Sequence, residues 1–526
     1  MSRDSSRGAA FLVGAGIFLS RIAGLVRNKV FAYYFGSSLA ADALNAAIRI
    51  PNLLQNLFGE GVLSASFIPA YAGLLGRGEK EESDRLAGVV AATLALTSAL
   101  VVLAGVLLAP SLVSLIAGGF TGARRDLTVQ LTRILFPGAG LLVLSAWCLG
   151  ILNSHRKFFV SYTAPVVWNI AMISALVGFG RGTPQVRLAE IVAWASVVGS
   201  ALQFGVQLPL VLKLAHGVRL NLDVGTPSAR SVFRNFLPAF ISRGVVQISA
   251  FIDAFIASWL PTGAVAVFAY AQVLYTLPVS LFGMAVSAAE LPVMSSATGT
   301  AEEIASYLRG RLDGGLERIA FYIVPSAVAF LALGDVISAV LFESGRFTRA
   351  DSVWVWQILA GSTIGLLAST WGRLYSSTFY ALRDTRTPLR FAVVRVVLTT
   401  ALGFLAALRL PGWLGVDPKL GVAGLTASAG IAGWVEFYLL RRALGRRIGK
   451  TGVAPSFMVK LWGAALASAA VAWGVKLGVT GQHRVVIALV ILLAYGVSFL
   501  LIATLLKIPE ASAMTSRLRR NRGRST

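Results

Sequence analysis

The residues of this sequence that could do chemistry are charged and amide side chains set at helical spacing within apolar stretches. Within 39–66, five of them follow at spacings of 3, 4, 3 and 4 residues, which places them along one face of an α-helix. They are Asp42, Asn45, Arg49, Asn52 and Asn56, and Glu60 continues the row one turn further. Such a face can donate and accept hydrogen bonds and carries both signs of charge.

The preceding apolar stretch, 9–31, adds Ser20, Arg21 and Arg27. Guanidinium groups stay charged at every working pH and match phosphate oxygens bidentately, so several of them around one space suit a phosphate-bearing ligand. Arg21 and Arg27 lie about 120° apart on a helix and would have to converge through their long stems. The alternative is an interhelical network that only stabilises a bundle. We favour a water-filled cavity, because a polar stripe of this length cannot face lipid.

A second, weaker set of candidates lies further along the chain. Arg243 and Asp253 border one sector of a helix in 234–259, and they could line the same cavity or form an ion pair with no other role. Glu290 is equally open between structural pairing and cavity lining. The same two alternatives hold for Arg373, Arg395 and Glu436.

The elements that position these residues follow from composition. The chain has 526 residues, is 56% hydrophobic and 13% charged, and has a mean hydropathy of +0.74. A soluble protein carries roughly a quarter charged residues, so this composition indicates an integral membrane protein. The apolar runs are long and do not alternate, which favours helices over a barrel. We expect an all-α protein with about fourteen spans, near 9–31, 39–66, 87–110, 128–152, 162–180, 188–212, 234–259, 263–293, 316–340, 353–380, 389–408, 420–440, 457–476 and 484–506.

The formal net charge of +24 is distributed as in a membrane protein rather than a nucleic-acid-binding one. With both termini cytoplasmic, that side collects 29 Lys and Arg residues against 11 on the other side, in keeping with the positive-inside rule. No base-stacking motif accompanies these cations, so we do not expect nucleic acid as a partner.

The sequence gives little support for a disulfide, a metal site or an enzyme active site. The single Cys148 excludes an internal disulfide, and the three histidines match no metal-ligand spacing, so we expect neither a metal nor a cofactor. The segment "GRRIGKT" at 445–451 is one residue too short between its glycines for a phosphate-binding loop. The "SHRK" segment at 154–157 lacks the partner motifs of a serine enzyme. We therefore do not expect an enzyme.

The chain repeats itself at a nearly constant offset. "FLSR" at 18–21 returns as "FISR" at 240–243, "LFG" at 57–59 returns at 281–283, and "TAP" at 163–165 matches "RTP" at 386–388. Six spans separate the copies, which predicts two parallel six-helix lobes and two additional C-terminal helices. The expected segments are an N-terminal lobe 1–225, a C-terminal lobe 226–450, a last helix pair 451–508 and a basic cytoplasmic tail 509–526.

Several segments resemble one known family. They are "SRIAGLVRN", "FGSSLAADALNAAIRIPNLL", "EGVLSASFIPAY", "GILNSHRKF", "APVVWNI", "ESGRFT" and "FYALRDTRTP", distributed from about residue 8 to 505. They are similar to the lipid II flippases of the MurJ/MviN family, within the multidrug/oligosaccharidyl-lipid/polysaccharide exporter superfamily. The resemblance implies fourteen helices, a groove for the undecaprenyl tail on the last pair, and transfer of lipid II across the bacterial cytoplasmic (inner) membrane for peptidoglycan biosynthesis.

The resemblance also implies roles for particular residues. Arg21, Arg27 and Asp42 match positions that the family needs for function, and Arg49 and Glu60 match a basic and an acidic family position. Together with Asn52 and Arg243 they form our predicted substrate-binding set, and Ser20, Asn45, Asn56, Asp253 and Glu290 are further candidate cavity residues.

The chain departs from the family pattern at two positions. Gln55 and Val273 stand where family members often have arginines, and Thr276 replaces a family acid. Because Arg243 lies at membrane depth and is the repeat counterpart of Arg21, we hypothesise that it takes over the missing arginine's role.

The expected function is flipping of lipid II by alternating access, with coupling to membrane potential or monovalent ions and no cofactor. We expect a monomer whose partners are lipid II, membrane lipids and cell-wall synthesis enzymes. Three alternatives stay open. They are a flippase for another undecaprenyl-linked glycan, a cation-coupled multidrug exporter, and a non-transporting scaffold for cell-wall synthesis.

Overall fold

The structure is a computed structural model that describes residues 3–58, 60–479, 484–512 and 514. Side chains are described for these residues except 3–14, 58, 60–62, 64–65, 235 and 237–250. All regular structure in the described residues is helical apart from one bridge between Ser344 and Phe347. The predicted all-α class is thereby confirmed.

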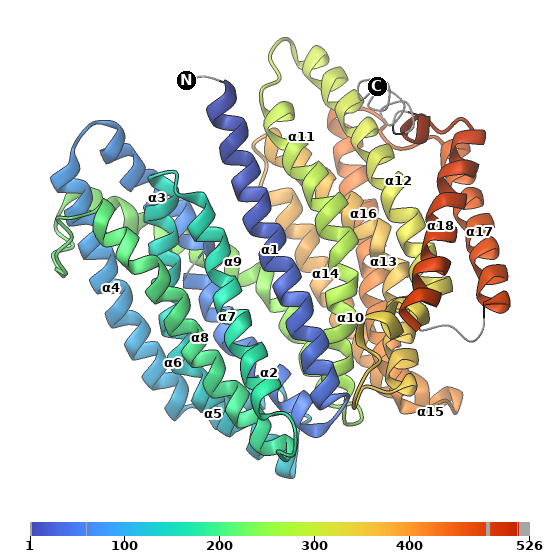
Figure 1. Cartoon of the computed structure of the whole chain (residues 1–526). Helices are drawn as coiled ribbons and strands as arrows, with labels where there is room; N and C mark the ends of the chain where they lie inside the picture. Colours follow the sequence, from blue (N-terminus) through green and yellow to red (C-terminus); the bar gives the residue numbers. More distant parts are fainter. Residues whose placement is uncertain (1–2, 59, 480–483, 513, 515–526) are drawn as a thin grey trace, which may run out of the picture. The chain divides into compact units, whose positions relative to one another are not determined.

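The chain forms two compact units, of which the first comprises residues 1–266 and 344–347. Its helices are α1 (Arg3–Phe35), α2 (Leu39–Phe58), α3 (Glu60–Gly76), α4 (Lys80–Leu107), α5 (Ala109–Ile116), α6 (Gly122–Ser154), α7 (Phe158–Phe179), α8 (Gln185–Leu214) and α9 (Pro227–Ser258) (Figure 1). Local sequence explains where α9 begins. Thr226 caps α9 by accepting from the Ala229 N–H, and Pro227 follows at the first helical position.

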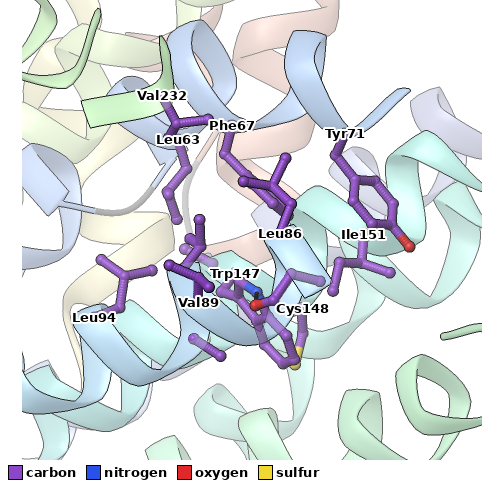
Figure 2. Packing of buried hydrophobic residues seen from close by; sticks show 14 of the residues in the cluster. Leu63, Phe67, Tyr71, Leu86, Val89, Leu94, Trp147, Cys148, Ile151 and Val232 are labelled. Carbon is purple, nitrogen blue, oxygen red and sulfur yellow. Dashed lines mark hydrogen bonds between the residues drawn. The ribbon is translucent and has the colours of Figure 1, made fainter. Parts of the chain in front are cut away.

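Helix α6 lies at the centre of the first unit, where it packs against α2, α4 and α8. Figure 2 shows the hydrophobic cluster that α6 builds with α3 and α4, including Phe67, Leu86 and Trp147. The Trp147 indole donates to the Ala87 carbonyl at 3.1 Å, so its one polar atom is satisfied inside the cluster. Close approach of α4 and α6 depends on Gly105, since a Cβ there would meet the Phe136 ring at 2.0 Å.

The second unit comprises residues 267–343 and 348–526. It contains most of α10 (Ala264–Pro278), the π-helix η1 (Val279–Met284), α11 (Ala285–Ser295), α12 (Ala301–Phe342), α13 (Arg349–Ala381), α14 (Arg386–Phe404), the π-helix η2 (Leu405–Arg409), α15 (Leu410–Leu414), the 3₁₀ turn η3 (Pro418–Leu420), α16 (Gly421–Ile448), α17 (Pro455–Gly478) and α18 (Arg484–Leu505). Capping boxes start the two longest helices of this unit, with Thr300 and Glu303 on α12 and Thr348 and Asp351 on α13.

The last two helices pack on each other and on α12. The Tyr495 hydroxyl donates to the Pro325 carbonyl at 2.7 Å, and the Trp473 indole donates to the Ala332 carbonyl at 2.9 Å. One end of the pair is also held by ion pairs, from Lys476 to Asp335 at 2.9 Å and from Arg484 to Glu343 at 2.7 Å. The predicted C-terminal helix pair is present, and its use as a groove for a lipid tail stays a prediction.

Among the described residues, 11 helical segments are long and apolar enough to cross a membrane. The other three predicted spans fall on α1, on α2 with α3, and on α9, so the count of fourteen stays a prediction. Helix α2 is a poor span by composition, because Asp42, Arg49 and its amide side chains lower its hydropathy.

The compact units divide after Ala266, and α9 packs against α3 in the first unit. The lobe boundary predicted at 225 describes the sequence repeat and does not coincide with this division.

The contact at Gly105 generates a stability prediction. We expect Gly105→Ala to lower the melting temperature of the purified protein, because overpacking a filled core costs about 1–3 kcal/mol. The matched control is Gly205→Ala in α8, where an added Cβ meets nothing within 4 Å. The control should melt at or above the temperature of the unmodified protein, since alanine favours helix over glycine. Equal melting temperatures for the two variants would contradict the proposed packing.

Candidate functional site

Asp42, in the first turn of α2, is completely buried and binds the start of α10. Its Oδ2 accepts the Gly263 N–H at 2.7 Å and its Oδ1 accepts the Ala266 N–H at 2.9 Å. The first N–H groups of a helix have no partner within the helix, and a carboxylate there satisfies them and also interacts favourably with the helix dipole. Asp42 is thus the capping group of a helix that lies 221 residues further along the chain.

Arg124, near the start of α6, neutralises this buried carboxylate. Its Nη1 lies 3.3 Å from the Asp42 Oδ2, and its side chain is only 12% exposed. The other guanidinium nitrogen, Nη2, donates to the carbonyls of Gly119 and Ser258 at 3.4 and 3.3 Å. The guanidinium carbon also lies 4.1 Å from the centre of the Phe120 ring, a cation–π contact. These contacts tie α2, α6 and the end of α9 to the first turn of α10.

The geometry of Asp42 changes the role that the sequence predicts for it. Its side chain has no exposed surface in this conformation, so it cannot contact a ligand directly. The helical stripe on α2 is therefore not one continuous lining. Its first residue is a positioning residue held inside the protein.

Arg27 on α1 is half-buried and rests on Trp168 of α7, with its guanidinium carbon 4.8 Å from the ring centre. The indole N–H of Trp168 donates to the carbonyl and hydroxyl of Ser196, both at 3.1 Å, which fixes the orientation of the ring. Arg27 itself donates from Nη2 to the Asn28 side chain at 3.1 Å. Stacking holds the guanidinium in place without a carboxylate, so it keeps donors for a further anion.

Arg21, the second predicted cation of α1, has an exposed side chain. Among the residues that the structure describes, no carboxylate lies within ion-pair distance of Arg21 or of Arg27. The arrangement that would have argued against a ligand role, arginines locked to acids in dry packing, is therefore not found for this pair. Ser20 beside Arg21 is half-buried.

The remaining residues of the α2 stripe divide into an inner and an outer group. Asn45 donates to the Ala41 carbonyl of its own helix at 2.8 Å, and Arg49 is half-buried and interacts electrostatically with Asp253 of α9. Asn52 and Asn56, one and two turns further, are exposed on the surface of the first unit. The outer group is exposed and is therefore the part of the stripe that a ligand can reach.

Two predicted residues cannot be assigned from the structure. Glu60 begins α3 and Arg243 lies in α9, and the side chains of both fall outside the described residues. The hypothesis that Arg243 replaces a missing family arginine stays a prediction. Asp253, its suggested partner, interacts electrostatically with Arg49.

In the second unit, Glu290 of α11 is buried between two arginines of α12. The Arg311 Nη2 lies 2.6 Å from one carboxylate oxygen, and the Arg318 Nη1 lies 3.3 Å from the other. These ion pairs are the structural pairing that the sequence allowed, and a role of Glu290 in lining a cavity stays a prediction. Arg395 and Glu436 likewise form an ion pair at 3.2 Å between α14 and α16.

Sequence reasoning missed two residues that organise the site. The sequence places Arg124 only among the cations of the loops, because it lies 82 residues after Asp42 and no helical spacing connects the two. Trp168 lies in the family-like segment "APVVWNI", but only the packing of α1 on α7 reveals that it supports Arg27.

The buried network around Asp42 leads to a second prediction. We expect Asp42→Ala to destabilise the protein by about 3–5 kcal/mol, since it leaves a buried guanidinium without its carboxylate and two backbone N–H groups at the start of α10 without acceptors. Asp42→Asn keeps an acceptor and should lie between this variant and the unmodified protein. Thermal unfolding of the purified proteins measures both. The control Asn45→Ala removes only a bond to the same helix and should stay close to the unmodified protein.

Comparisons with known proteins identify the family of this chain. The family model described as "Lipid II flippase MurJ" matches residues 31–495. The "Lipid II flippase MurJ" of Burkholderia cenocepacia is 32% identical over 468 residues, covering 87% of this chain and 88% of the relative. The "Probable lipid II flippase MurJ" of Rhizobium tropici is 33% identical over 445 residues, covering 83% and 80%.

Solved structures give the same fold. A lipid II flippase MurJ in an inward closed conformation superposes with a TM-score of 0.77 at 24% identity, covering 94% of this chain and 98% of that one. An inward-facing multidrug resistance MATE family transporter of the MOP superfamily has a TM-score of 0.62 at 19% identity, covering 80% and 95%. Since the family model spans most of the sequence and the two relatives are matched over 80–88% of their length, the chain belongs to the lipid II flippase MurJ family.

Proposed function

We propose that this protein flips lipid II from the inner to the outer leaflet of the bacterial cytoplasmic membrane, and so supplies peptidoglycan synthesis. Membership of the MurJ family over residues 31–495 supports the substrate. The observation that carries the proposal is the state of the two α1 arginines. Arg27 is held by stacking on Trp168 and Arg21 is exposed, and neither is paired with an acid among the described residues.

Unpaired guanidinium groups in a membrane-spanning helix are costly unless they meet an anion or water. The diphosphate of lipid II offers several oxygens to two such groups, and each charge-assisted hydrogen bond contributes about 1.5–3 kcal/mol. In our proposal Arg21 and Arg27 hold the diphosphate. The exposed amides Asn52 and Asn56 of α2 provide neutral donors and acceptors for the sugar and peptide part of the headgroup.

In this proposal Asp42 acts by holding the start of α10 in position rather than by contacting the substrate. By capping α10 it fixes the first turn of that helix to α2 and α6, and the helix then continues into the second unit. Any rearrangement of α10 during alternating access would therefore begin beyond Ala266. This accounts for a functional need for Asp42 without direct contact with the substrate.

The remaining features of the proposal concern energy and orientation. We place both termini in the cytoplasm on the basis of the Lys and Arg distribution. Resetting the transporter through membrane potential is energetically sufficient, at about 2.3 kcal/mol per charge per 100 mV. Monovalent ions are a second possible source. The protein is a transporter rather than a catalyst and acts as a monomer, alongside the enzymes of cell-wall synthesis.

The competing functions differ in testable ways. A multidrug exporter shares the helical fold but needs an acidic, aromatic pocket for cations, whereas Arg21 and Arg27 favour an anion. A flippase for another undecaprenyl-linked glycan would use the same diphosphate chemistry, so only the identity of the transported lipid separates it. A scaffold would not need Arg21 or Arg27 at all.

Depletion of the protein tests the substrate. We expect lipid II to accumulate in the inner leaflet before growth stops, because synthesis continues while export fails. The measurement is mass spectrometry of extracted lipid-linked precursors during depletion, with a strain depleted of an unrelated membrane transporter as control. Accumulation of a different undecaprenyl-linked lipid would replace the proposed substrate.

Substitution of the arginines tests the mechanism. We expect Arg21→Ala and Arg27→Ala each to reduce flipping about tenfold or more, since each removes charge-assisted bonds to the diphosphate. Flipping is measured as the fraction of lipid II accessible to a membrane-impermeant headgroup-cleaving enzyme added outside spheroplasts. The control Arg187→Ala removes an exposed arginine that pairs with Glu190 and should retain activity. Normal flipping by both α1 variants at normal protein abundance would favour the scaffold.

A further inference from the structure

The first unit has a second cationic site, lined by residues of α5, α6 and α8 rather than by residues of α1 and α2. A surface pocket of about 470 Å³ is lined by residues of α5, α6 and α8, and α6 packs against each of the other two helices (Figure 1). Its polar lining comes from α6, with Arg125, Asp126, Gln130 and Arg133. Pro110 of α5 and Trp194 of α8 complete the wall.

The two arginines are placed to act together. Arg125 and Arg133 are eight residues apart on α6, which separates them by about 80° around the helix and about 12 Å along its axis, and both line the pocket. Arg125 is half-buried and donates one bond, to the Ser114 hydroxyl at 3.3 Å. Arg133 is exposed and, within the described part of the chain, has no hydrogen-bond or ion-pair partner. Both guanidinium groups therefore keep donors for an anion.

The nearby acids leave the pocket positive. Glu190 of α8 accepts from Arg187 at 2.6 Å and from Gln130 at 2.8 Å, so its carboxylate is already engaged. Asp126 is the one acid in the lining, set against two arginines. A net charge of about +1 suits a headgroup with a single negative charge and disfavours a diphosphate.

The position of the pocket along its helices matches the headgroup layer. In α6 the charge-free run begins directly after Arg133 and covers 21 residues, Ile134–Ser154. At 1.5 Å per residue it spans about 30 Å, the thickness of the hydrocarbon core. In α8 the charge-free run begins after Glu190, which puts the exposed Trp194 one turn inside, at the level of an interfacial aromatic belt.

We propose that this pocket binds the phosphodiester of an anionic glycerophospholipid, of the phosphatidylglycerol class. Arg125 and Arg133 hold the phosphate oxygens, and Gln130 faces the headgroup. Trp194, with the apolar side chains of Val129 and Ile134, packs against the glycerol and the start of the acyl chains. The pocket uses no residue of the proposed lipid II site, so its binding of phospholipid can be tested independently of the flipping function.

The test uses the purified, delipidated full chain in detergent. Native mass spectrometry and thermal unfolding are recorded with dioleoyl phosphatidylglycerol, with the matched phosphatidylcholine, and with inorganic phosphate. We expect phosphatidylglycerol to bind and to raise the melting temperature, and the other two probes to have little effect. The Arg125→Gln/Arg133→Gln variant should bind phosphatidylglycerol at least about tenfold more weakly.

Matched single variants keep the result interpretable if the double variant fails to fold. Arg133→Gln removes an exposed arginine of the pocket, and Arg181→Gln removes an exposed arginine outside it, between α7 and α8. Only the first should weaken binding of phosphatidylglycerol. Equal binding by the two single variants, or equal binding of phosphatidylglycerol and phosphatidylcholine to the unmodified protein, would overturn the proposal. An equal effect of inorganic phosphate would show that the pocket recognises a free anion and would equally overturn it.

Discussion

The first unit depends on one buried carboxylate. Asp42 has no contact with the surface, and burying a charge in an apolar medium costs several kcal/mol unless it is paired and hydrogen-bonded. This cost is offset by the backbone N–H groups of Gly263 and Ala266 at the start of α10 and by the guanidinium of Arg124. Because these donors come from different parts of the chain, satisfying one charge fixes the relative positions of α2, α6 and the start of α10.

The cost of burying an unpaired charge also separates structural charges from ligand-binding charges in the rest of the molecule. Glu290 is held by Arg311 and Arg318, and Asp335 by Lys476 and Arg349. These groups join helices and have little capacity left for a ligand. Arg27, in contrast, is supported by an aromatic face, which orients a cation without neutralising it. An arginine arranged in this way can bind an anion and release it again.

Close helix packing provides the rigid frame for these groups. A Cβ at Gly105 would meet the Phe136 ring, and a Cβ at Gly365 would lie 2.4 Å from the Gly430 Cα. Small residues let helix backbones approach where the lipid supplies no hydrophobic driving force. Within each unit the helices are therefore fixed by shape, and the few polar interactions decide register and orientation.

The sequence by itself determined the class of the protein and the location of its unusual charges. Hydropathy gives a helical membrane protein because every backbone group in the bilayer must be paired within the segment. Helical spacing predicts the polar stripe on α2, and the position of Arg21 and Arg27 within an apolar stretch identifies the unusual cations of α1. The family-like segments predict the substrate. Tertiary structure decided which of these residues a ligand can reach. Spacing assigns a residue to a face but not to a partner, so it could not show that Arg124 would neutralise Asp42 or that Trp168 would support Arg27. It also could not show that the stripe passes from the protein interior at Asp42 to the surface at Asn52 and Asn56, because that depends on helices distant in the sequence packing over one end of α2.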